Sequence, residues 1–331
     1  MNYHEEKLKK IAEKINETAE CDYNYFHKQT MMVPSRKEGI EIIKNIQELM
    51  FPDYFHLDEN KGKSQEDLLD ELFIKIKRQI TAAWSFCSHC NGKSVVDTEA
   101  LSYEILSEIP KIKEALIKDV QAIYEGDPAA MAPEEIILSY PGFYAISIYR
   151  IAHEFYIRKI PYISRLMTEF AHEKTGIDIH AGATIGEYFF IDHGTGIVIG
   201  ETTEIGDDVL IYQGVTLGGT GKDTGKRHPT IGNNVMISAG AKVLGPFKIG
   251  DNSRIAAGAV VLEEVPPNCT VVGVPARVVR QDGKKVGCAQ SLDQIHIPDP
   301  VKQKMECLEK RIKELEKQVC GIEGEDEDED I

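Results

Sequence analysis

Three short segments of the sequence bring together side chains that can take part in chemistry. Asp192 and His193 are adjacent in "FFIDHGTGIVIG", Arg227 and His228 are adjacent in "GGTGKDTGKRHPT", and the third segment is "GVPARVV" at 273–279. An imidazole titrates near neutral pH and can accept and return a proton. A guanidinium can hold a carboxylate through two parallel hydrogen bonds. Because the sequence around these segments is regular, we expect the function to reside in them.

The regular sequence is a repeat with a period of six residues. Aliphatic residues stand at Ile179, Ile185, Ile191, Ile197, Ile199, Ile205, Ile211, Leu217, Ile231, Ile237, Val243, Ile249, Ile255 and Val261. Neither the helical period of about 3.6 nor the strand period of about 2 produces this spacing. A parallel β-helix does, because each hexapeptide forms one flat side and the aliphatic residues stack inside. Fourteen hexapeptides at three per coil predict about five coils, and residues 218–230 must leave the stack as a loop.

The sequence predicts an α+β protein with three regions. Residues 1–176 are predicted to form an α-helical domain, residues 177–280 the β-helix, and residues 281–331 a C-terminal helix followed by an acidic tail. Two apolar stripes are predicted to pack together in a helical bundle, and they consist of Leu8, Ile11, Ala12 and Ile15, and of Leu68, Leu69, Leu72, Phe73, Ile76 and Ile80. Further helices are predicted over 133–139, 142–158 and 161–174, with Gly176 as a C-terminal cap.

Composition and charge exclude several classes of function. The formal net charge of −16 argues against nucleic-acid binding. The chain has no apolar run of membrane-spanning length and no signal peptide at its start. Seven scattered cysteines fit free thiols in a reducing cytoplasm. Cys87 and Cys90 have the spacing of metal ligands or a redox pair, but no second pair follows, so we interpret them as packing and surface thiols.

The motifs closely resemble those of serine O-acetyltransferases, a family of the hexapeptide-repeat acyltransferase superfamily. The resemblance covers residues 120–280 and rests on "DIHAGATIG", "DHGTGIVIGET", "GVTLGGTGK", "KRHPTIG", "AAGAVVLEEVPPN" and "VVGVPARVV". The hexapeptide pattern alone indicates only the superfamily, whereas "DHGTG", "GGTGK" and "RHP" together are far more specific. The resemblance implies a left-handed β-helix that transfers acetyl from acetyl-CoA to the hydroxyl of L-serine, the first step of cysteine biosynthesis.

The resemblance also implies catalytic roles. His193 is the expected base that accepts the serine hydroxyl proton, which is typically worth about 10² to 10⁴ in rate. Asp178, fifteen residues earlier, is expected to orient the His193 ring, as the carboxylate of a hydrolase triad does. His228 is expected to bind serine, or to polarise the reacting groups, from the neighbouring subunit.

Binding roles follow from the same resemblance. Asp127 and Asp192 are expected to bind the serine ammonium, Arg227 is expected to bind its carboxylate, and Glu201 is expected to support the site. Small residues at coil corners, Gly219, Ala239 and Ala257, leave room for the pantetheine arm of acetyl-CoA. Lys222 and Arg277 are expected to meet its phosphates. For Glu201 and Lys222 an ordinary surface role stays open. No metal is expected.

Three alternatives stay open. A zinc-dependent β-helix carbonic anhydrase needs three histidine ligands, and the sequence after His228 offers Gly232 and Asn233 instead. A β-helix acetyltransferase could act on another small acceptor, although paired acids and Arg227 favour an amino acid over a neutral sugar. A non-enzymatic scaffold has no need of Asp178, His193 and Arg227 together.

The resemblance implies partners as well. Members of this family form trimers with sites between subunits, and the helical domain could join two trimers into a hexamer. L-cysteine is expected to inhibit because it carries the same ammonium and carboxylate as L-serine. The last residue, Ile331, could enter the active site of O-acetylserine sulfhydrylase, although it follows the acidic run "GEDEDED", which alternatively reads as a solubilising tail.

A short heptad stripe precedes that tail. Its members follow a 4-3-4-3-4 spacing and are Val301, Met305, Leu308, Ile312, Leu315 and Val319. The stripe predicts either a coiled coil or a single helix lying on its own subunit, because fewer than three heptads do not decide between the two. Ile at a with Leu at d leans toward two strands, whereas a trimer axis would bundle three.

Overall fold

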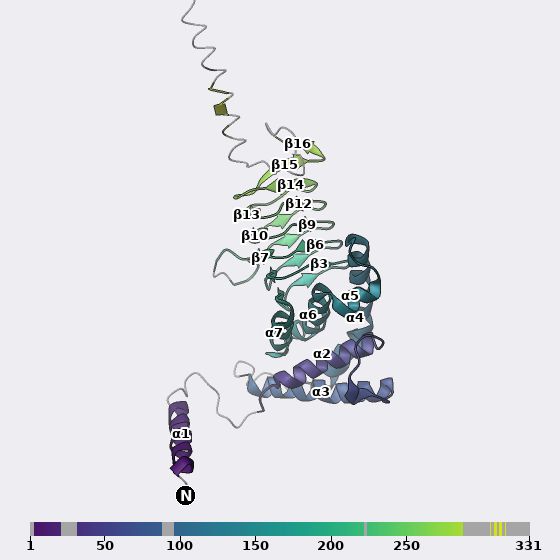
Figure 1. Cartoon of the computed structure of the whole chain (residues 1–331), viewed down its shortest axis with the longest axis vertical. Helices are drawn as coiled ribbons and strands as arrows, with labels where there is room; N and C mark the ends of the chain where they lie inside the picture. Colours follow the sequence, from purple (N-terminus) through teal and green to yellow (C-terminus); the bar gives the residue numbers. More distant parts are fainter. Residues whose placement is uncertain are drawn as a thin grey trace, which may run out of the picture.

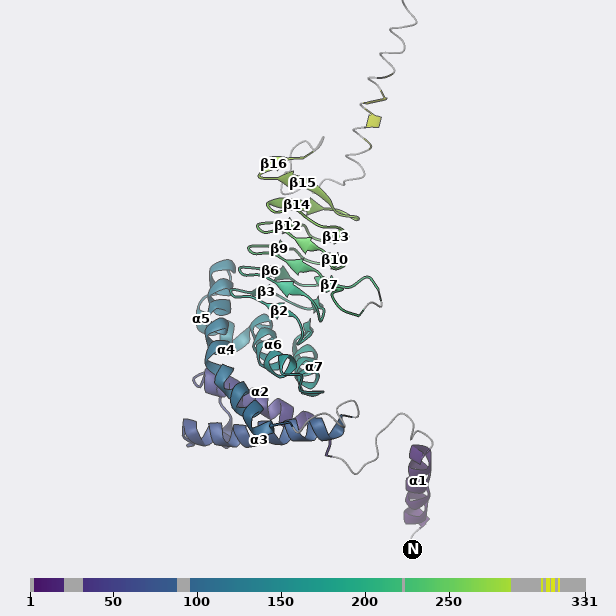
Figure 2. The ribbon, with the colours of Figure 1, turned by 180° about the vertical axis from the view of Figure 1, so that it is seen from behind.

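The computed structural model describes residues 3–20, 32–87, 96–221 and 224–286, together with 305, 308, 309, 311, 312 and 315. Within these residues a bundle of helices caps one end of a stack of short strands, and α1 stands apart from both (Figures 1 and 2). The expected helical domain followed by a parallel β-helix is confirmed.

Helices occupy the N-terminal half of the described chain. They are α1 (Tyr3–Glu20), α2 (Arg36–Met50), the 3₁₀ helix η1 (Asp58–Asn60), α3 (Gln65–Phe86), α4 (Thr98–Gly126), α5 (Pro133–Ser139), α6 (Pro141–Ile157) and α7 (Ile163–Thr175). Local signals fix several ends: Ser64 and Asp67 form a reciprocal capping box at the start of α3. At the end of α7, Gly176 takes a left-handed conformation with φ of 70°, as predicted for a C-terminal cap.

The two predicted apolar stripes differ in what covers them. Leu72, Ile76 and Ile80 on α3 are fully buried in the bundle. Leu8, Ile11 and Ile15 on α1 are instead 53%, 54% and 64% exposed. The prediction that the α1 stripe packs into the bundle is therefore wrong for this chain on its own. Periodicity predicted the helix correctly, but a stripe does not specify which surface covers it.

Short parallel strands build a three-sided β-helix after α7. They are β1 (Asp178–Ile179), β2 (Thr184–Ile185), β3 (Phe190–Asp192), β4 (Val198–Ile199), β5 (Glu204–Ile205), β6 (Leu210–Tyr212), β7 (Thr216–Gly218), β8 (Thr230–Ile231), β9 (Met236–Ile237), β10 (Lys242–Leu244), β11 (Lys248–Ile249), β12 (Arg254–Ile255) and β13 (Val260–Val261). Face A stacks β1, β4, β7, β10 and β13; face B stacks β2, β5, β8 and β11; face C stacks β3, β6, β9 and β12.

The predicted repeat residues form the core of this β-helix. On face A, Ile179 pairs in register with Ile199, Ile199 with Leu217, Leu217 with Val243, and Val243 with Val261. All fourteen predicted positions are buried. Three further strands, β14 (Cys269–Val272), β15 (Arg277–Gln281) and β16 (Lys284–Lys285), continue face C, and β15 and β16 run antiparallel. The predicted loop after β7 stands out from the stack (Figures 1 and 2).

A buried ion pair joins the helices to the first coil. The Asp119 carboxylate on α4 is fully buried and accepts hydrogen bonds from the Arg150 guanidinium on α6 at 2.8 and 2.9 Å. The same carboxylate accepts the backbone N–H of Phe189, at 2.9 Å, just before β3. Arg150 also donates to the carbonyl of Gly186. This pair therefore fixes α4 and α6 against the start of β3.

The cysteines depart from the expectation in one place. Cys87, which follows α3, is buried and disulfide-bonded, so it is not a free thiol. Its predicted companion Cys90 lies outside the described residues, whereas Cys269 is free and buried. Across the described ranges, no helix is long and apolar enough to cross a membrane.

Candidate active site

The candidate residues gather at the two corners that bound face A. His193 lies at the corner between faces C and A, where the chain turns from β3 to β4. Glu201, Arg227 and His228 lie at the corner between faces A and B, where the chain turns from β4 to β5 and from β7 to β8. We call these groups the His193 corner and the Arg227 corner. Within one chain, the length of face A separates them.

The His193 corner is open. His193 has a left-handed backbone with φ of 56°, a conformation that is uncommon outside glycine but favoured by histidine, asparagine and aspartate. Its side chain is 73% exposed, and Nε2 lies 3.7 Å from Oδ1 of Asp192. An exposed imidazole next to a carboxylate can take a proton from a group that arrives from solvent.

A second carboxylate is brought to this corner by the end of α4. Asp127 caps that helix and accepts the Ala129 N–H at 2.8 Å and the Tyr140 hydroxyl at 2.7 Å. The hydrogen bond to Asp127 raises the pKa of Tyr140 to about 12, and burial and the nearby charge of Asp192 add to the shift. Tyr140 therefore stays a neutral donor that bridges the surroundings of both acids. Asp127 and Asp192 both act on Tyr140, and carboxylates that lie near one another suit an ammonium group.

Asp178 is the first residue of β1 and pairs with Val198. Val198 is the first residue of β4, the strand that follows the His193 corner. It is half-buried and lies at the same end of face A as His193. Among the described residues, no hydrogen bond or ion pair joins the Asp178 carboxylate to the His193 imidazole. The orienting role of Asp178 stays a prediction.

The Arg227 corner is tightly held. One Arg227 Nη donates to Glu201, and the other oxygen of Glu201 accepts the Tyr156 hydroxyl from α6 at 2.8 Å. The Arg227 hydrogen bond lowers the pKa of Glu201, and the Tyr156 hydrogen bond adds to this, so the carboxylate is ionised at neutral pH. Burial and the bond to Glu201 raise the pKa of Tyr156 to about 12. Glu201 thus orients Arg227, whose remaining N–H groups can bind an anion.

His228 is 8% exposed and is fixed in one tautomer. Its Nδ1 accepts the backbone N–H of Thr202 at 3.1 Å, and the Thr202 hydroxyl is 2.9 Å away. Because a backbone N–H can only donate, the proton of the neutral ring is on Nε2. Burial, followed by the charge of Arg227, lowers the pKa of His228. His228 is therefore suited to donate a hydrogen bond. A Cβ at Gly200 would overlap its ring, so only glycine fits beneath it.

The predicted acetyl-CoA residues are dispersed. Ala239 is half-buried and Ala257 is exposed. Both lie on the edge of the β-helix that holds the His193 corner, Ala239 one coil and Ala257 two coils beyond Gln213. A Cβ at the adjoining Gly240 or Gly258 would meet nothing within 4 Å, so this side of the corner is open to a narrow chain. Gly219 is exposed at the Arg227 corner. These small residues fit the pantetheine arm in size.

The structure offers less support for the two predicted phosphate-binding residues. Arg277 is exposed and forms an ion pair with Glu263 at 2.9 Å, so a phosphate would compete with that carboxylate. Lys222 lies outside the described residues.

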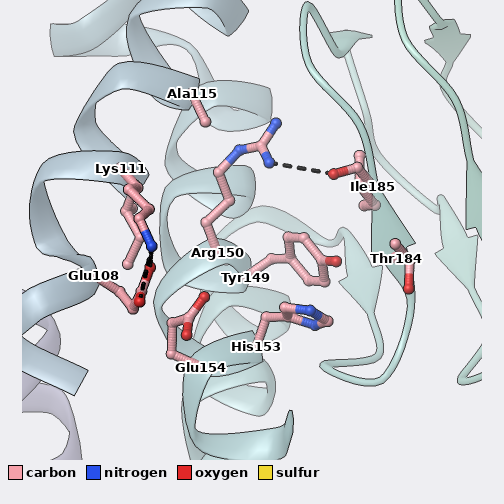
Figure 3. Close-up of a pocket in the computed structure, with 10 residues that line it drawn as sticks. Glu108, Lys111, Ala115, Tyr149, Arg150, His153, Glu154, Thr184 and Ile185 are labelled. Carbon is pink, nitrogen blue, oxygen red and sulfur yellow. Dashed lines mark hydrogen bonds and ion pairs between the residues drawn. The ribbon is translucent and has the colours of Figure 1, made fainter. Parts of the chain in front are cut away.

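A pocket of about 220 Å³ lies elsewhere, between α4, α6 and β2 (Figure 3). Its lining includes Glu108, Arg150, His153 and Glu154, and none of the predicted site residues lines it. His153 Nδ1 donates to the carbonyl of Ala181 at 2.7 Å, and Arg150 is engaged as described above. The polar lining thus serves to hold the helices against the first coil.

Three contributing residues were not predicted from the sequence. Tyr140 and Tyr156 hold Asp127 and Glu201, and the Thr202 side chain accepts the N–H groups of both Arg227 and His228. Thr202 follows Glu201 in the "GET" motif, so that motif was the available signal. Tyr140, between α5 and α6, and Tyr156, on α6, carry no such signal. In the described part of the chain, no group of three or more His, Cys, Asp or Glu residues could hold a metal ion.

Fold and site together define a hexapeptide-repeat transferase. Residues 228–263 match the family described as bacterial transferase hexapeptide (six repeats), and residues 89–147 match the family described as serine acetyltransferase, N-terminal. Over 200 residues the chain is 52% identical to the serine acetyltransferase of Bacillus subtilis (strain 168), which covers 60% of this chain and 91% of that relative. The chain belongs to the serine acetyltransferase family.

Solved structures agree with this assignment. Serine acetyltransferase 1 of Entamoeba histolytica in complex with L-cysteine is 39% identical, with a TM-score of 0.60 over 70% of this chain and 85% of that chain. Serine acetyltransferase of Brucella abortus strain S19 in complex with coenzyme A is 35% identical, with a TM-score of 0.54 over 77% of this chain and 85% of that chain.

Proposed function

We propose that this chain is a serine O-acetyltransferase, which transfers acetyl from acetyl-CoA to the hydroxyl of L-serine and releases O-acetyl-L-serine and CoA. This reaction opens cysteine biosynthesis. Residues 177–280 would form the acetyltransferase domain, residues 1–176 the helical domain, and residues 281–331 the tail, all in the cytoplasm.

One observation carries the choice of an amino acid as acceptor. The two corners offer opposite charges, with Asp127 and Asp192 at one and Arg227 at the other. A free amino acid carries an ammonium and a carboxylate, so it needs both. We assign the ammonium to Asp127 and Asp192 and the carboxylate to the N–H groups of Arg227 that Glu201 leaves available.

The proton and electron movements balance with the residues at hand. The serine oxygen attacks the thioester carbonyl carbon while His193 takes the hydroxyl proton, and the new C–O bond leaves the carbonyl oxygen negative. His228 donates its Nε2–H to that oxygen. Collapse breaks the C–S bond, and the proton on His193 passes to the departing thiolate. Asp178 is assigned to orient His193 in this step.

The first test is thiol release from acetyl-CoA, with and without L-serine, for the parent and for His193→Ala. Serine-dependent release that disappears in the variant supports both the reaction and the base. If the parent shows no dependence on serine, the acceptor is a different small molecule and the assignment of the corners to an amino acid fails.

L-cysteine is proposed to inhibit by occupying the serine site. It carries the same two charged groups as serine, and a relative in this family binds it. Added L-cysteine should therefore raise the apparent KM for serine. An unchanged rate with millimolar cysteine and subsaturating serine would contradict this.

We further propose that chains assemble as trimers, or dimers of trimers, so that the His193 corner of one copy meets the Arg227 corner of the next. The separation of the corners by face A motivates this. The test refolds inactive His193→Asn and Arg227→Ala chains together, so that mixed assemblies form. Shared sites predict recovery of about a quarter of the parent activity, because one interface in four combines two intact corners. No recovery, or a fully active monomer in sedimentation, would overturn the proposal.

The alternative function, a zinc-dependent lyase, can be tested by metal analysis. His193 and His228 lie at different corners, so a shared zinc would also need a second copy of the chain. One zinc per subunit in the purified protein, together with loss of activity on chelation, would replace the mechanism above.

The terminal Ile331 lies outside the described residues. We propose that it enters the active site of O-acetylserine sulfhydrylase, with the acidic residues before it resting on a basic rim of that partner. Deletion of Ile331 should abolish co-purification of the two proteins. Unchanged co-purification would assign the tail to solubility alone.

A further inference from the structure

A further imidazole lies at the Arg227 corner and has no part in the reaction proposed above. His180 directly follows β1, whose last residue Ile179 pairs in register with Ile199. His180 therefore stacks on Gly200, the residue after Ile199 in the next coil, at the spacing of about 4.8 Å between neighbouring strands. A Cβ at Gly200 would lie 2.1 Å from Nε2 of His228. The His228 ring thus fills the place next to His180 in the stack.

The His180 ring is held in the same tautomer as the His228 ring. Its Nδ1 accepts the backbone N–H of Gly182 at 3.0 Å, and a backbone N–H can only donate, so the proton of the neutral ring is on Nε2. Burial lowers the pKa of His180, although the charge of Glu201 opposes the shift, so the ring is neutral at neutral pH. Within the described ranges, no protein group accepts the Nε2–H of either imidazole.

Tyr156 on α6 fixes the orientation of the His180 ring. The two ring centroids are 5.6 Å apart and the rings are inclined at 84°, the edge-to-face arrangement that aromatic pairs favour. A Cβ at Gly182 would lie 2.7 Å from the Tyr156 ring, so the tyrosine packs directly on the backbone that bonds His180. The Tyr156 hydroxyl also donates to Glu201, which orients Arg227. One side chain of the helical domain therefore holds both His180 and Arg227 in place.

The charges at this corner favour a ligand with a single negative charge. Glu201 pairs with Arg227 and cancels the charge of the guanidinium. Glu204 pairs with Lys226 at 3.0 Å in the same way. Because both imidazoles are neutral, the described part of the corner keeps no net positive charge with which to neutralise a dianion such as inorganic phosphate. A carboxylate carries one charge and is bound well by N–H donors.

We propose that His180 is a specificity-determining residue, and that its Nε2–H donates to the carboxylate of the amino-acid substrate beside the Arg227 guanidinium. One Nη of Arg227 is bonded to Glu201, whereas the other reaches the carbonyl of Gly225 at 3.5 Å and can turn to the carboxylate. His228 keeps its Nε2–H for the carbonyl oxygen of the acetyl group. This role rests on the proposed function, because it extends the assignment of Arg227. All three donors belong to one chain, so the role is independent of how copies assemble.

Two substitutions separate the Nε2 donor from the rest of the ring. Asparagine places an acceptor oxygen near the position of Nδ1, so His180→Asn keeps a partner for the Gly182 N–H and loses the donor. Glutamine places its amide nitrogen near the position of Nε2, so His180→Gln is the conservative variant that supplies a donor again. His172→Asn makes the same change at an exposed imidazole on α7 and is the control.

Calorimetric titration of the full-length protein with L-serine, without acetyl-CoA, measures the contact directly. A hydrogen bond to a charged group is lost in His180→Asn, so the Kd should rise about 10 to 100-fold, with His180→Gln within about fivefold of the parent. L-Serinamide lacks the carboxylate, so the preference for L-serine over L-serinamide should fall by the same factor as serine binding. An unchanged Kd for L-serine in His180→Asn, or equal losses for both ligands, would overturn the proposal.

Inorganic phosphate tests the choice of a monoanion. Millimolar phosphate should leave the Kd of L-serine unchanged in the parent, because the corner has no spare positive charge. Displacement of L-serine by phosphate would show that the corner accepts a dianion, and the assignment to a carboxylate would fail.

Thiol release on the same samples separates this proposal from the proposed reaction. In His180→Asn the KM for L-serine should rise about 10 to 100-fold, while kcat and the KM for acetyl-CoA change less than about twofold. A fall in kcat at constant KM would contradict the carboxylate contact. Serine-dependent release that His180→Asn leaves unchanged contradicts the contact alone. Binding of L-serine that depends on His180, in a parent without serine-dependent release, contradicts the reaction and leaves the contact standing.

Discussion

The two corners of face A differ in how far the chain itself completes them. His228 is 8% exposed and its Nδ1 is engaged by Thr202, whereas the His193 side chain is 73% exposed and lies 3.7 Å from Asp192. The Arg227 corner is thus preorganised to bind and to donate, which is the arrangement that stabilises charge in a transition state. The His193 corner is open to solvent.

The helical domain supports the two corners by separate contacts. Tyr156 on α6 reaches Glu201 at the Arg227 corner, whereas Tyr140, which follows α5, reaches Asp127 beside Asp192. A substitution can therefore weaken one corner while the contacts that support the other stay intact. The following changes test this separation.

His193→Asn is expected to have the largest effect. Asparagine tolerates the left-handed backbone at this position, so the corner keeps its shape while the base is lost. The serine-dependent rate should fall about 10² to 10⁴-fold. His172→Asn, which replaces an exposed imidazole on α7, is the control and should retain the parent rate. A variant that keeps more than about a tenth of the rate would exclude His193 as the base.

Asp119→Asn tests the support of the His193 corner. It leaves the Arg150 guanidinium, whose side chain is 10% exposed, without its carboxylate, which costs about 3 to 5 kcal/mol of unfolding free energy. Burial raises the pKa of Asp119 while Arg150 opposes that shift. Urea unfolding measures the loss.

The neighbouring Lys118→Gln is the control for that experiment. Lys118 forms exposed ion pairs with Glu114 and Glu187, and pairs of this kind are worth under about 1 kcal/mol. Equal losses in the two variants would show that the Asp119–Arg150 pair has no special role in joining α4 to β3.

Arg227→Lys tests the preorganised corner. Lysine keeps the charge but cannot hold Glu201 and a substrate carboxylate through a planar fork. We expect kcat/KM for serine to fall about 10 to 100-fold with the KM for acetyl-CoA unchanged. Arg254→Lys on exposed face C makes the same change away from the site and should have no effect. Equal changes in both KM values would refute a carboxylate-binding role.

The fold was predictable wherever one physical period determined it. Every repeat residue from Ile179 to Val261 is buried, because the six-residue spacing places these aliphatic side chains on the inside of each coil. The α1 stripe was predicted as bundle core and is exposed, because a helical period does not identify its covering surface. The C-terminal stripe has the same ambiguity, and its described residues Leu308 and Ile312 are exposed.

The candidate site was predictable where it interrupts the repeat. Asp192, His193, Arg227 and His228 stand out because a buried wall has no use for them. Tyr140 and Asp119 do not stand out, because their partners are 13 and 31 residues away and an isolated tyrosine or aspartate has no spacing signal. The neutral tautomer of His228 depends on a backbone N–H, which no sequence pattern displays.

Tyr140→Phe is expected to have a smaller effect, at the His193 corner only. It removes one hydrogen bond to a partly exposed carboxylate, worth about 1 kcal/mol. The KM for serine should therefore rise about fivefold with kcat nearly unchanged, if Asp127 binds the ammonium. Tyr103→Phe, whose ring stacks on Phe73 at the surface, is the control. A fall in kcat at constant KM would instead place Tyr140 in the chemical step.

The smallest expected effect is on the pH dependence of stability, and it comes from the buried imidazole of His228 at the Arg227 corner. Burial and the Arg227 charge lower the pKa of His228 below its ordinary value of about 6.5. The unfolded chain therefore binds this proton at a higher pH than the folded chain does. The neutral ring's contribution to stability is complete above pH 6.5 and is lost as the pH falls through the folded pKa.

His228→Asn should remove that part of the acid dependence. The parent's unfolding free energy should fall more steeply than the variant's below pH 6.5, by at most about 1.4 kcal/mol per pH unit. Urea unfolding of both proteins between pH 7 and pH 5 isolates this contribution, since His180, whose pKa is lowered by its own burial, is common to both. Parallel curves would mean that His228 accepts a proton freely, and it could not then serve as the fixed neutral donor that distinguishes this corner from the other.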